Sequence, residues 1–158
     1  MSGISRYVAG LGVGLCLGLM AGTAGAQGMI APSLAEAKTA LAATEEAAVE
    51  MGVGLSCAVV DSRGTLVAMT RMDSARYFTA NVAAGKARAS AAFGAPSGGL
   101  TRVGELGLEK VIDGGEMLFL QGAVPIMKDG NLVGALGCSG ASAQQDEDAA
   151  NAGVAAML

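Results

Sequence analysis

The sequence contains no histidine and no tryptophan, and its only aromatic residues are two tyrosines and three phenylalanines. Without histidine, Ser-His-Asp and Cys-His nucleophilic sites are excluded. The commonest protein ligand for zinc and iron is missing as well, and so is histidine ligation of heme within one chain. Any acid–base, metal or heme chemistry must therefore use other side chains.

Charged residues are also scarce. They make up 15% of the 158 residues against 52% hydrophobic residues, and the formal net charge is −4. This composition is typical of a single folded domain. No short window holds more than two Lys or Arg residues. Because a nucleic-acid partner requires a basic surface that neutralises phosphates, we expect none.

The one long apolar run stands at the N-terminus. It covers residues 7–20, follows a short segment whose only charge is Arg6, and precedes a small-x-small site at residues 24–26. A run of this length is short of the ~20 residues that a membrane span needs. We predict a signal peptide at residues 1–26 and a single domain at residues 27–158, exported to the periplasm or secreted, without stable membrane insertion. Retention of the run as a membrane anchor is the alternative.

Signal cleavage leaves two cysteines, Cys57 and Cys138, because Cys16 lies in the leader. An oxidising compartment permits a disulfide between them. Both residues lie in apolar, strand-like runs, where a free cysteine packs as a small hydrophobic residue. We therefore favour two buried free thiols, with the disulfide as the alternative.

Local patterns predict four helices and five strands. The first helix begins at a capping box formed by Ser33 and Glu36 and ends at Gly52, and the last begins at a second capping box with Ser142. Between them we expect, in order, strands at 53–60 and 65–71, helices at 80–93 and 100–112, and strands at 117–120, 123–127 and 131–139.

Two hairpins separated by helices predict an α/β fold of the α+β type, with a mostly antiparallel five-stranded sheet flanked by helices. The first hairpin turns at Asp61–Gly64, and the second at residues 128–130. The strands of the first hairpin are largely apolar on both faces. Such a sheet must be covered on both sides, by helices or by another subunit.

Three stretches carry a family resemblance. They read VVDSRGTLVAMTRMD at residues 59–73, GKARASAAFG at 85–94, and VPIMKDGNLVGALGCSG at 124–140 followed by Gln145 and Asp146. In order and spacing they resemble the GlcG/HbpS-like heme-binding family, which is related to the C-terminal domain of PduO-type proteins. The resemblance implies a profilin-like fold, a homo-oligomer and, in some members, heme binding. Two features depart from the family pattern. The family commonly has a Gly-Gly pair before Val-Pro, where this sequence reads Gln121-Gly122-Ala123, and histidine is absent.

The candidate site residues surround the end of the second strand. Arg71 and Asp73 stand there, and the guanidinium of Arg71 suits a carboxylate such as a heme propionate. An ion pair between the two that fixes the loop is the alternative. Lys86, which follows Gly85, either faces a ligand pocket or is a surface lysine with a buried stem.

With histidine absent, Met72 and Tyr77 are the plausible ligands left for a heme iron. Phe78 either packs on the porphyrin or belongs to the core. The family match puts the segment containing Gly122 and Pro125 beside this loop. We therefore expect a pocket between residues 71–78, the helix bearing Lys86, and residues 122–125.

The leading hypothesis is an exported homo-oligomer that binds a small ligand, namely heme or a related tetrapyrrole. An enzyme or accessory protein for a small hydroxy acid or alcohol is a second reading, with Asp61, Asp73 or Lys86 as acid or base. An oligomeric accessory protein without a ligand is the third. Enzymatic activity is the less expected outcome.

Overall fold

The computed structural model describes residues 31–108, 110 and 113–158, so the predicted signal peptide lies outside the described residues. The elements follow in the order α1 (Leu34–Met51), β1 (Ser56–Asp61), β2 (Leu66–Arg71), α2 (Thr79–Phe93), the short 3-10 helix η1 (Ser97–Leu100), α3 (Thr101–Glu105), β3 (Ala123–Lys128), β4 (Asn131–Ser139) and α5 (Ala143–Met157). Within the described ranges, no helix combines the length and the apolar character needed to cross a bilayer.

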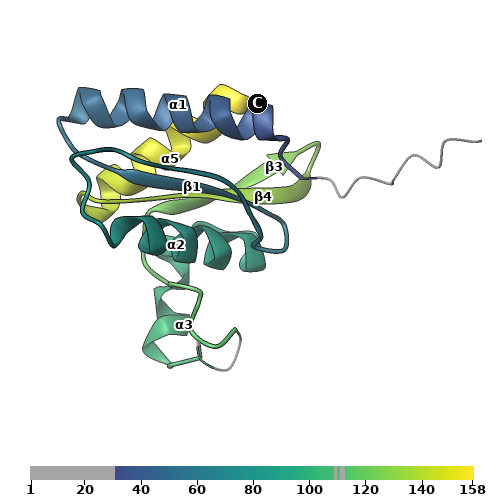
Figure 1. Ribbon diagram of the computed structural model, residues 1–158. Coiled ribbons are helices and arrows are strands. Elements are labelled where there is room, and N and C mark those ends of the chain that lie inside the picture. Colours follow the sequence, from purple (N-terminus) through teal and green to yellow (C-terminus); the bar gives the residue numbers. More distant parts are fainter. Residues whose placement is uncertain (1–30, 109, 111–112) are drawn as a thin grey trace, which may run out of the picture.

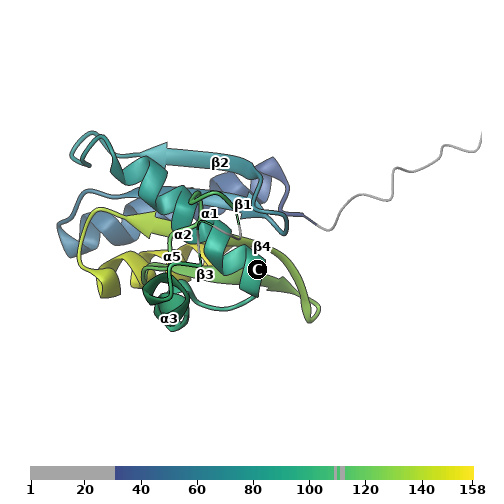
Figure 2. The same ribbon diagram turned by 90° about the horizontal axis from the view of Figure 1, so that it is seen from below.

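One antiparallel sheet forms the middle layer. Its strand order is β2-β1-β4-β3, and every neighbouring pair is antiparallel. Helices α1 and α5 cover one face and α2 covers the other, while α3 lies beyond α2 (Figure 1). Strands β2 and β3 form the two edges (Figure 2). The predicted α+β class and the antiparallel sheet between helices are confirmed.

The prediction of five strands is wrong, because this sheet has four. Residues 117–120 are not a strand. The backbone N–H of Leu118 donates to the carbonyl of Gly85 in α2, at 3.0 Å, so this segment bonds to a helix instead of a sheet edge. The predicted helix at 100–112 is also shorter than expected. Helix α3 ends at Glu105, and Gly107 has a φ of 68°, although residues 109, 111 and 112 lie outside the described part.

Both long terminal helices begin as the sequence predicts. Ser33 and Glu36 form a reciprocal capping box at α1, and Ser142 forms the same arrangement with Gln145 at α5. Gly52 ends α1 in the left-handed region, with a φ of 68°. These signals were readable from sequence because each involves residues only three positions apart or a single backbone dihedral.

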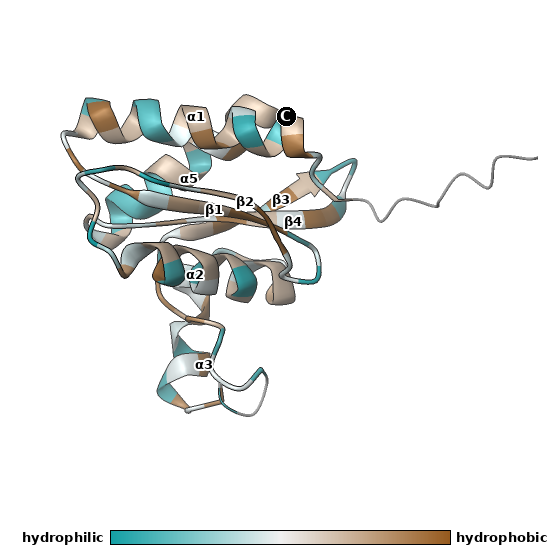
Figure 3. Cartoon of the chain, viewed as in Figure 1, coloured by the Kyte–Doolittle hydropathy of each residue, from teal (hydrophilic) through white to brown (hydrophobic). Residues whose placement is uncertain are grey.

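The two faces of the sheet differ in the size of their side chains. The face toward α1 and α5 carries larger groups such as Val59, Ile126 and Leu136, whereas the face toward α2 carries mainly small ones. The strands between these helices are coloured mostly toward the hydrophobic end of the scale in Figure 3. A Cβ on Gly137 would lie 2.6 Å from the carbonyl oxygen of Ala83 in α2. Helix α2 therefore rests almost directly on the backbone of β4.

A disulfide joins Cys57 of β1 to Cys138 of β4. The interpretation as two free thiols is therefore wrong. The strand register places the two residues directly opposite each other, with their Cα atoms 4.1 Å apart. They are 81 positions apart in sequence, so only the pairing of the central strands brings them together.

Candidate functional site

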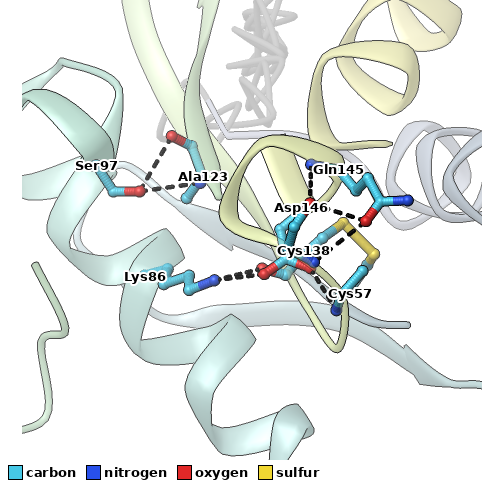
Figure 4. A network of polar contacts seen from close by, with 9 residues as sticks. Cys57, Lys86, Ser97, Ala123, Cys138, Gln145 and Asp146 are labelled. Carbon is cyan, nitrogen blue, oxygen red and sulfur yellow. Dashed lines mark hydrogen bonds and ion pairs between the residues drawn. A yellow bond between two sulfur atoms is a disulfide. The ribbon is translucent and has the colours of Figure 1, made fainter. Parts of the chain in front are cut away.

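A buried ion pair connects helices on opposite faces of the sheet. The ammonium of Lys86 in α2 lies 2.7 Å from Oδ2 of Asp146 in α5, and the two side chains are only 5% and 4% exposed. Lys86 also donates to the carbonyl of Cys138 at 3.2 Å, and Oδ1 of Asp146 accepts the backbone N–H of Ala141 at 3.0 Å (Figure 4). Each charge is thus matched by a charged partner and a backbone group, as a buried ion pair requires.

Gly122 makes room for this pair. Its φ of 127° lies in the region that favours glycine. A Cβ at this position would lie 2.7 Å from Nζ of Lys86 and 2.8 Å from Cβ of Asp146. The structure therefore brings together two predicted site residues, Lys86 and Gly122, and adds Asp146, which the site prediction missed. The signal that could have found Asp146 is its place at the end of the third family stretch.

Lys86 does not present its cation to solvent. The alternative of a surface lysine is wrong, because the residue is buried. The close approach that Gly85 permits is used by the chain itself, since a Cβ on Gly85 would lie 2.8 Å from Cγ of Leu118. The pair therefore holds α2, α5 and the end of β4 together.

Exposed side chains gather beside the start of α2. The hydroxyls of Ser56 and Thr79 lie 2.7 Å apart and tie this helix end to β1. Arg71 is the cross-strand partner of Ser56, so its side chain emerges on the same face of the sheet. Tyr77 is 84% and Phe78 43% exposed, and their rings meet edge to face at 5.5 Å. We call Arg71, Tyr77 and Phe78 the aromatic ledge.

Of the other predicted site residues, Asp73 lies in the loop that carries the ledge, whereas the side chains of Met72 and Pro125 lie elsewhere. Asp73 is exposed in the same loop, but among the described residues no ion pair joins it to Arg71. Met72 turns to the opposite face, lines a shallow hollow with residues of α1, and its sulfur accepts the N–H of Leu55 at 3.4 Å. Pro125 stands on β3, three strand spacings or about 14 Å from β2. Within one chain, the structure therefore does not bring Gly122 and Pro125 beside the loop.

A further apolar hollow separates α3 from residues 117–120. It has a volume of about 450 Å³ and is lined by residues that include Gly104, Met117 and Phe119. Around it, four large apolar side chains are between 41% and 59% exposed: Phe93, Leu106, Leu108 and Leu120. We call these four residues the apolar flank. No group of three or more metal-ligating side chains occurs in the described part of the chain.

Fold and site together define a small α+β domain with an internally satisfied ion pair and an exposed aromatic ledge. Residues 33–155 match the family model described as "Haem degrading protein HbpS-like". The chain belongs to this HbpS-like family, and the resemblance seen in the sequence is confirmed.

The relatives include proteins known by sequence and by structure. The chain is 33% identical to protein GlcG of Escherichia coli K12 over 111 residues, which are 65% of this chain and 77% of GlcG. Its fold matches a doubly substituted HbpS of Streptomyces reticuli with a TM-score of 0.74 at 31% identity, covering 97% of both chains. It also matches a PduOC:Heme complex with a TM-score of 0.72 at 30% identity, covering 80% of this chain and 94% of the other.

Proposed function

We propose that this protein is an exported heme-binding protein that works as a homo-oligomer. The observation that carries the proposal is the aromatic ledge. Two of the four aromatic residues beyond the predicted leader are adjacent and exposed here, beside Arg71. The family description names haem, and a related solved structure is a heme complex.

The ledge supplies what a flat, apolar dianion requires. Exposed aromatic rings offer a face or edge for the porphyrin to pack against. Arg71 and Arg76 make no ion pair within the described residues, so both guanidiniums are available to propionate carboxylates. The chain has no histidine, and the sulfur of Met72 already accepts a backbone N–H. Tyr77 is therefore the remaining predicted iron ligand with an exposed side chain.

The enzyme alternative has less support from the geometry. Oδ1 of Asp61 accepts the backbone N–H groups of Arg63 and Thr65 and so stabilises the turn after β1. Lys86 is paired with Asp146. Two of the three proposed acid–base residues are thus engaged in holding the fold, and only Asp73 stays exposed.

Export is consistent with the disulfide, because disulfides persist in oxidising compartments such as the periplasm. Self-association would use the apolar flank. Large apolar side chains that are exposed together commonly mark a protein–protein contact. The family resemblance implies a homo-oligomer as well.

Hemin titration followed by visible absorption tests the proposal. We expect a Soret shift that saturates near one heme per subunit. Because a hydrogen bond to a charged group is worth roughly 1.5–3 kcal/mol, Arg71→Ala should weaken heme affinity by about ten- to a hundredfold. Arg63→Ala is the matched control, since Arg63 is exposed on the turn at the opposite end of β2.

Two outcomes would contradict the proposal. One is the absence of any Soret shift, and the other is equal heme affinity in the Arg71 and Arg63 variants. Lys128→Ala is a poorer control, because Lys128 forms an ion pair with Glu36. Tyr77→Phe tests ligation separately. This substitution keeps the ring of the ledge, and we expect an unchanged Soret spectrum. A changed spectrum would show that the phenol oxygen of Tyr77 binds the iron.

A further inference from the structure

A second hollow opens at the other end of β2. It lies between the turn that joins β1 to β2 and residues 113–117, over helix α2, and it has a volume of about 380 Å³. Two arginines, Arg63 and Arg88, and two acids, Asp113 and Glu116, line it together with apolar Leu66 and Met117. Leu66 and Arg71 are five positions apart on β2, which places this hollow about 17 Å from the aromatic ledge.

Close backbone contacts hold the walls of this hollow in place. Gly64, with a φ of 81°, lies on the stem of Arg88, where a Cβ would come within 3.3 Å of Cγ of the arginine. The opposite wall is fixed to α2 by the hydrogen bond from Leu118 to the carbonyl of Gly85. Gly85 and Arg88 are three positions apart and lie on one face of α2. The same helix face therefore positions both walls.

The charges in the hollow are not matched by one another. Within the described residues, none of the two arginines and two acids forms an ion pair. Oδ1 of Asp113 accepts the N–H of Gly115 at 3.0 Å, but its Oδ2 is buried and has no hydrogen-bond partner. A carboxylate oxygen without a donor is unfavourable, so Asp113 lines the hollow with hydrogen-bonding capacity that the chain itself does not use.

We propose that this hollow binds a small zwitterion, namely an α-amino acid with an apolar side chain. Its carboxylate would pair with the guanidiniums of Arg63 and Arg88, which suit carboxylates geometrically. Its ammonium would donate to Asp113 and Glu116, and its side chain would pack on Leu66 and Met117. A ligand with only a negative charge would be repelled by the two acids, and a ligand with only a positive charge would be repelled by the two arginines. Only a ligand that carries both charges satisfies all four groups.

Calorimetric titration of the domain with three isosteric probes tests this assignment. L-leucine carries both charges, 4-methylpentanoate lacks the ammonium, and 3-methylbutylamine lacks the carboxylate. We expect saturable binding of L-leucine, and at least about tenfold weaker binding of each of the other two, because each loses one set of charge-assisted hydrogen bonds. Equal affinities for the three probes would overturn the proposal, and so would no binding of L-leucine at roughly millimolar concentration.

Variants locate the site. Arg88→Ala and Arg63→Ala should each weaken L-leucine binding by about tenfold or more, whereas Arg102→Ala on α3 should leave it unchanged. Arg63 is exposed on a turn, so its variant keeps the test valid if Arg88→Ala lowers stability. Unchanged binding in both Arg63 and Arg88 variants would overturn the assignment. Heme affinity, measured on the same two variants, should stay at the wild-type level, so the two sites fail or succeed separately.

Discussion

At the scale of single residues, Lys86 has the most constrained environment. Its ammonium is buried and contacts one carboxylate and one carbonyl. Gly122 packs so closely against this ammonium that a side chain at position 122 would not fit. A charge taken out of water is tolerated only while its partner is present. The pair Lys86–Asp146 therefore stabilises the fold conditionally, and removing one member harms the protein more than removing both.

We expect Lys86→Met to lower the free energy of unfolding by roughly 3–5 kcal/mol, because the carboxylate of Asp146 is left buried without its cation. The double variant Lys86→Met with Asp146→Leu should regain much of this loss. Urea denaturation measures both. Arg102→Met, which breaks the exposed pair with Glu105, should change stability by about 1 kcal/mol or less. A double variant as unstable as the sum of its single variants would contradict the account.

At the scale of elements, the first turn of α1 links the N-terminal end of the domain to the second hairpin. Glu36 completes the capping box with Ser33 and also pairs with Lys128 at the end of β3. The hydrogen bond from Lys128, followed by the backbone N–H of Ser33, lowers the pKa of Glu36 from 4.5 to about 2. One carboxylate thus caps a helix and ties it to a strand.

This pKa predicts a pH dependence of stability. The pKa of Glu36 is lower in the folded chain than in the unfolded one, so its contribution is present above about pH 4.5 and is lost as the pH falls toward 2. Thermal melting of Glu36→Gln should therefore differ from wild type near neutral pH and converge with it below pH 4.5. Glu46→Gln, at an exposed position of α1, is the control. If the difference in melting temperature between the wild type and Glu36→Gln stayed constant from neutral pH down to pH 2, this contribution would be ruled out.

At the scale of the whole molecule, the disulfide and the apolar flank lead to testable predictions. The disulfide joins the two central strands of the sheet and closes the chain over most of the domain. The residues of the apolar flank come from the end of α2 and from the segment that follows α3. Figure 1 shows α3 beyond α2, on the side away from the sheet that carries the cross-link. The first feature concerns stability, and the second concerns the proposed self-association.

The disulfide should contribute substantially to stability. Closing a loop of 81 positions restricts the unfolded chain, and Cys57→Ala with Cys138→Ala should cost roughly 2–5 kcal/mol in denaturant unfolding. Intact mass of the periplasmic fraction should give a chain that begins at Gln27 and lacks two hydrogens relative to its reduced form. A thiol reagent that labels both cysteines without denaturant would contradict the bond.

We expect light scattering of the mature protein at micromolar concentration to give more than one subunit. Leu106→Asp combined with Leu120→Asp should shift the protein toward monomer, because a charge on the apolar flank would be desolvated on association. Val49→Asp, on the exposed side of α1, should leave the mass unchanged. A monomeric wild type would exclude self-association, and an oligomeric double variant would place the contact on another surface.

Much of the local structure could be predicted from the sequence, and most of the site could not. The strand at 131–139 and both capping boxes were predicted to the residue, because an apolar run that follows a turn signal and a helix cap are both properties of short segments. The segment at 117–120 was predicted as a strand because its apolar run cannot reveal that Leu118 bonds to α2. Arg71, Tyr77 and Phe78 lie within eight consecutive residues, so their proximity could be predicted, whereas Asp146 could not be linked to Lys86.

The sequence by itself determined the absence of histidine chemistry, the helix boundaries set by Ser33, Gly52 and Ser142, the α+β class and the family. Tertiary structure alone decided the bond between Cys57 and Cys138, the burial of Lys86 against Asp146, and the separation of Pro125 from Arg71. The physical reason is the range of the interactions. Caps and turns act over three or four positions, whereas strand register and sheet order pair distant residues, such as Cys57 with Cys138, which are 81 positions apart, and depend on how the whole chain packs.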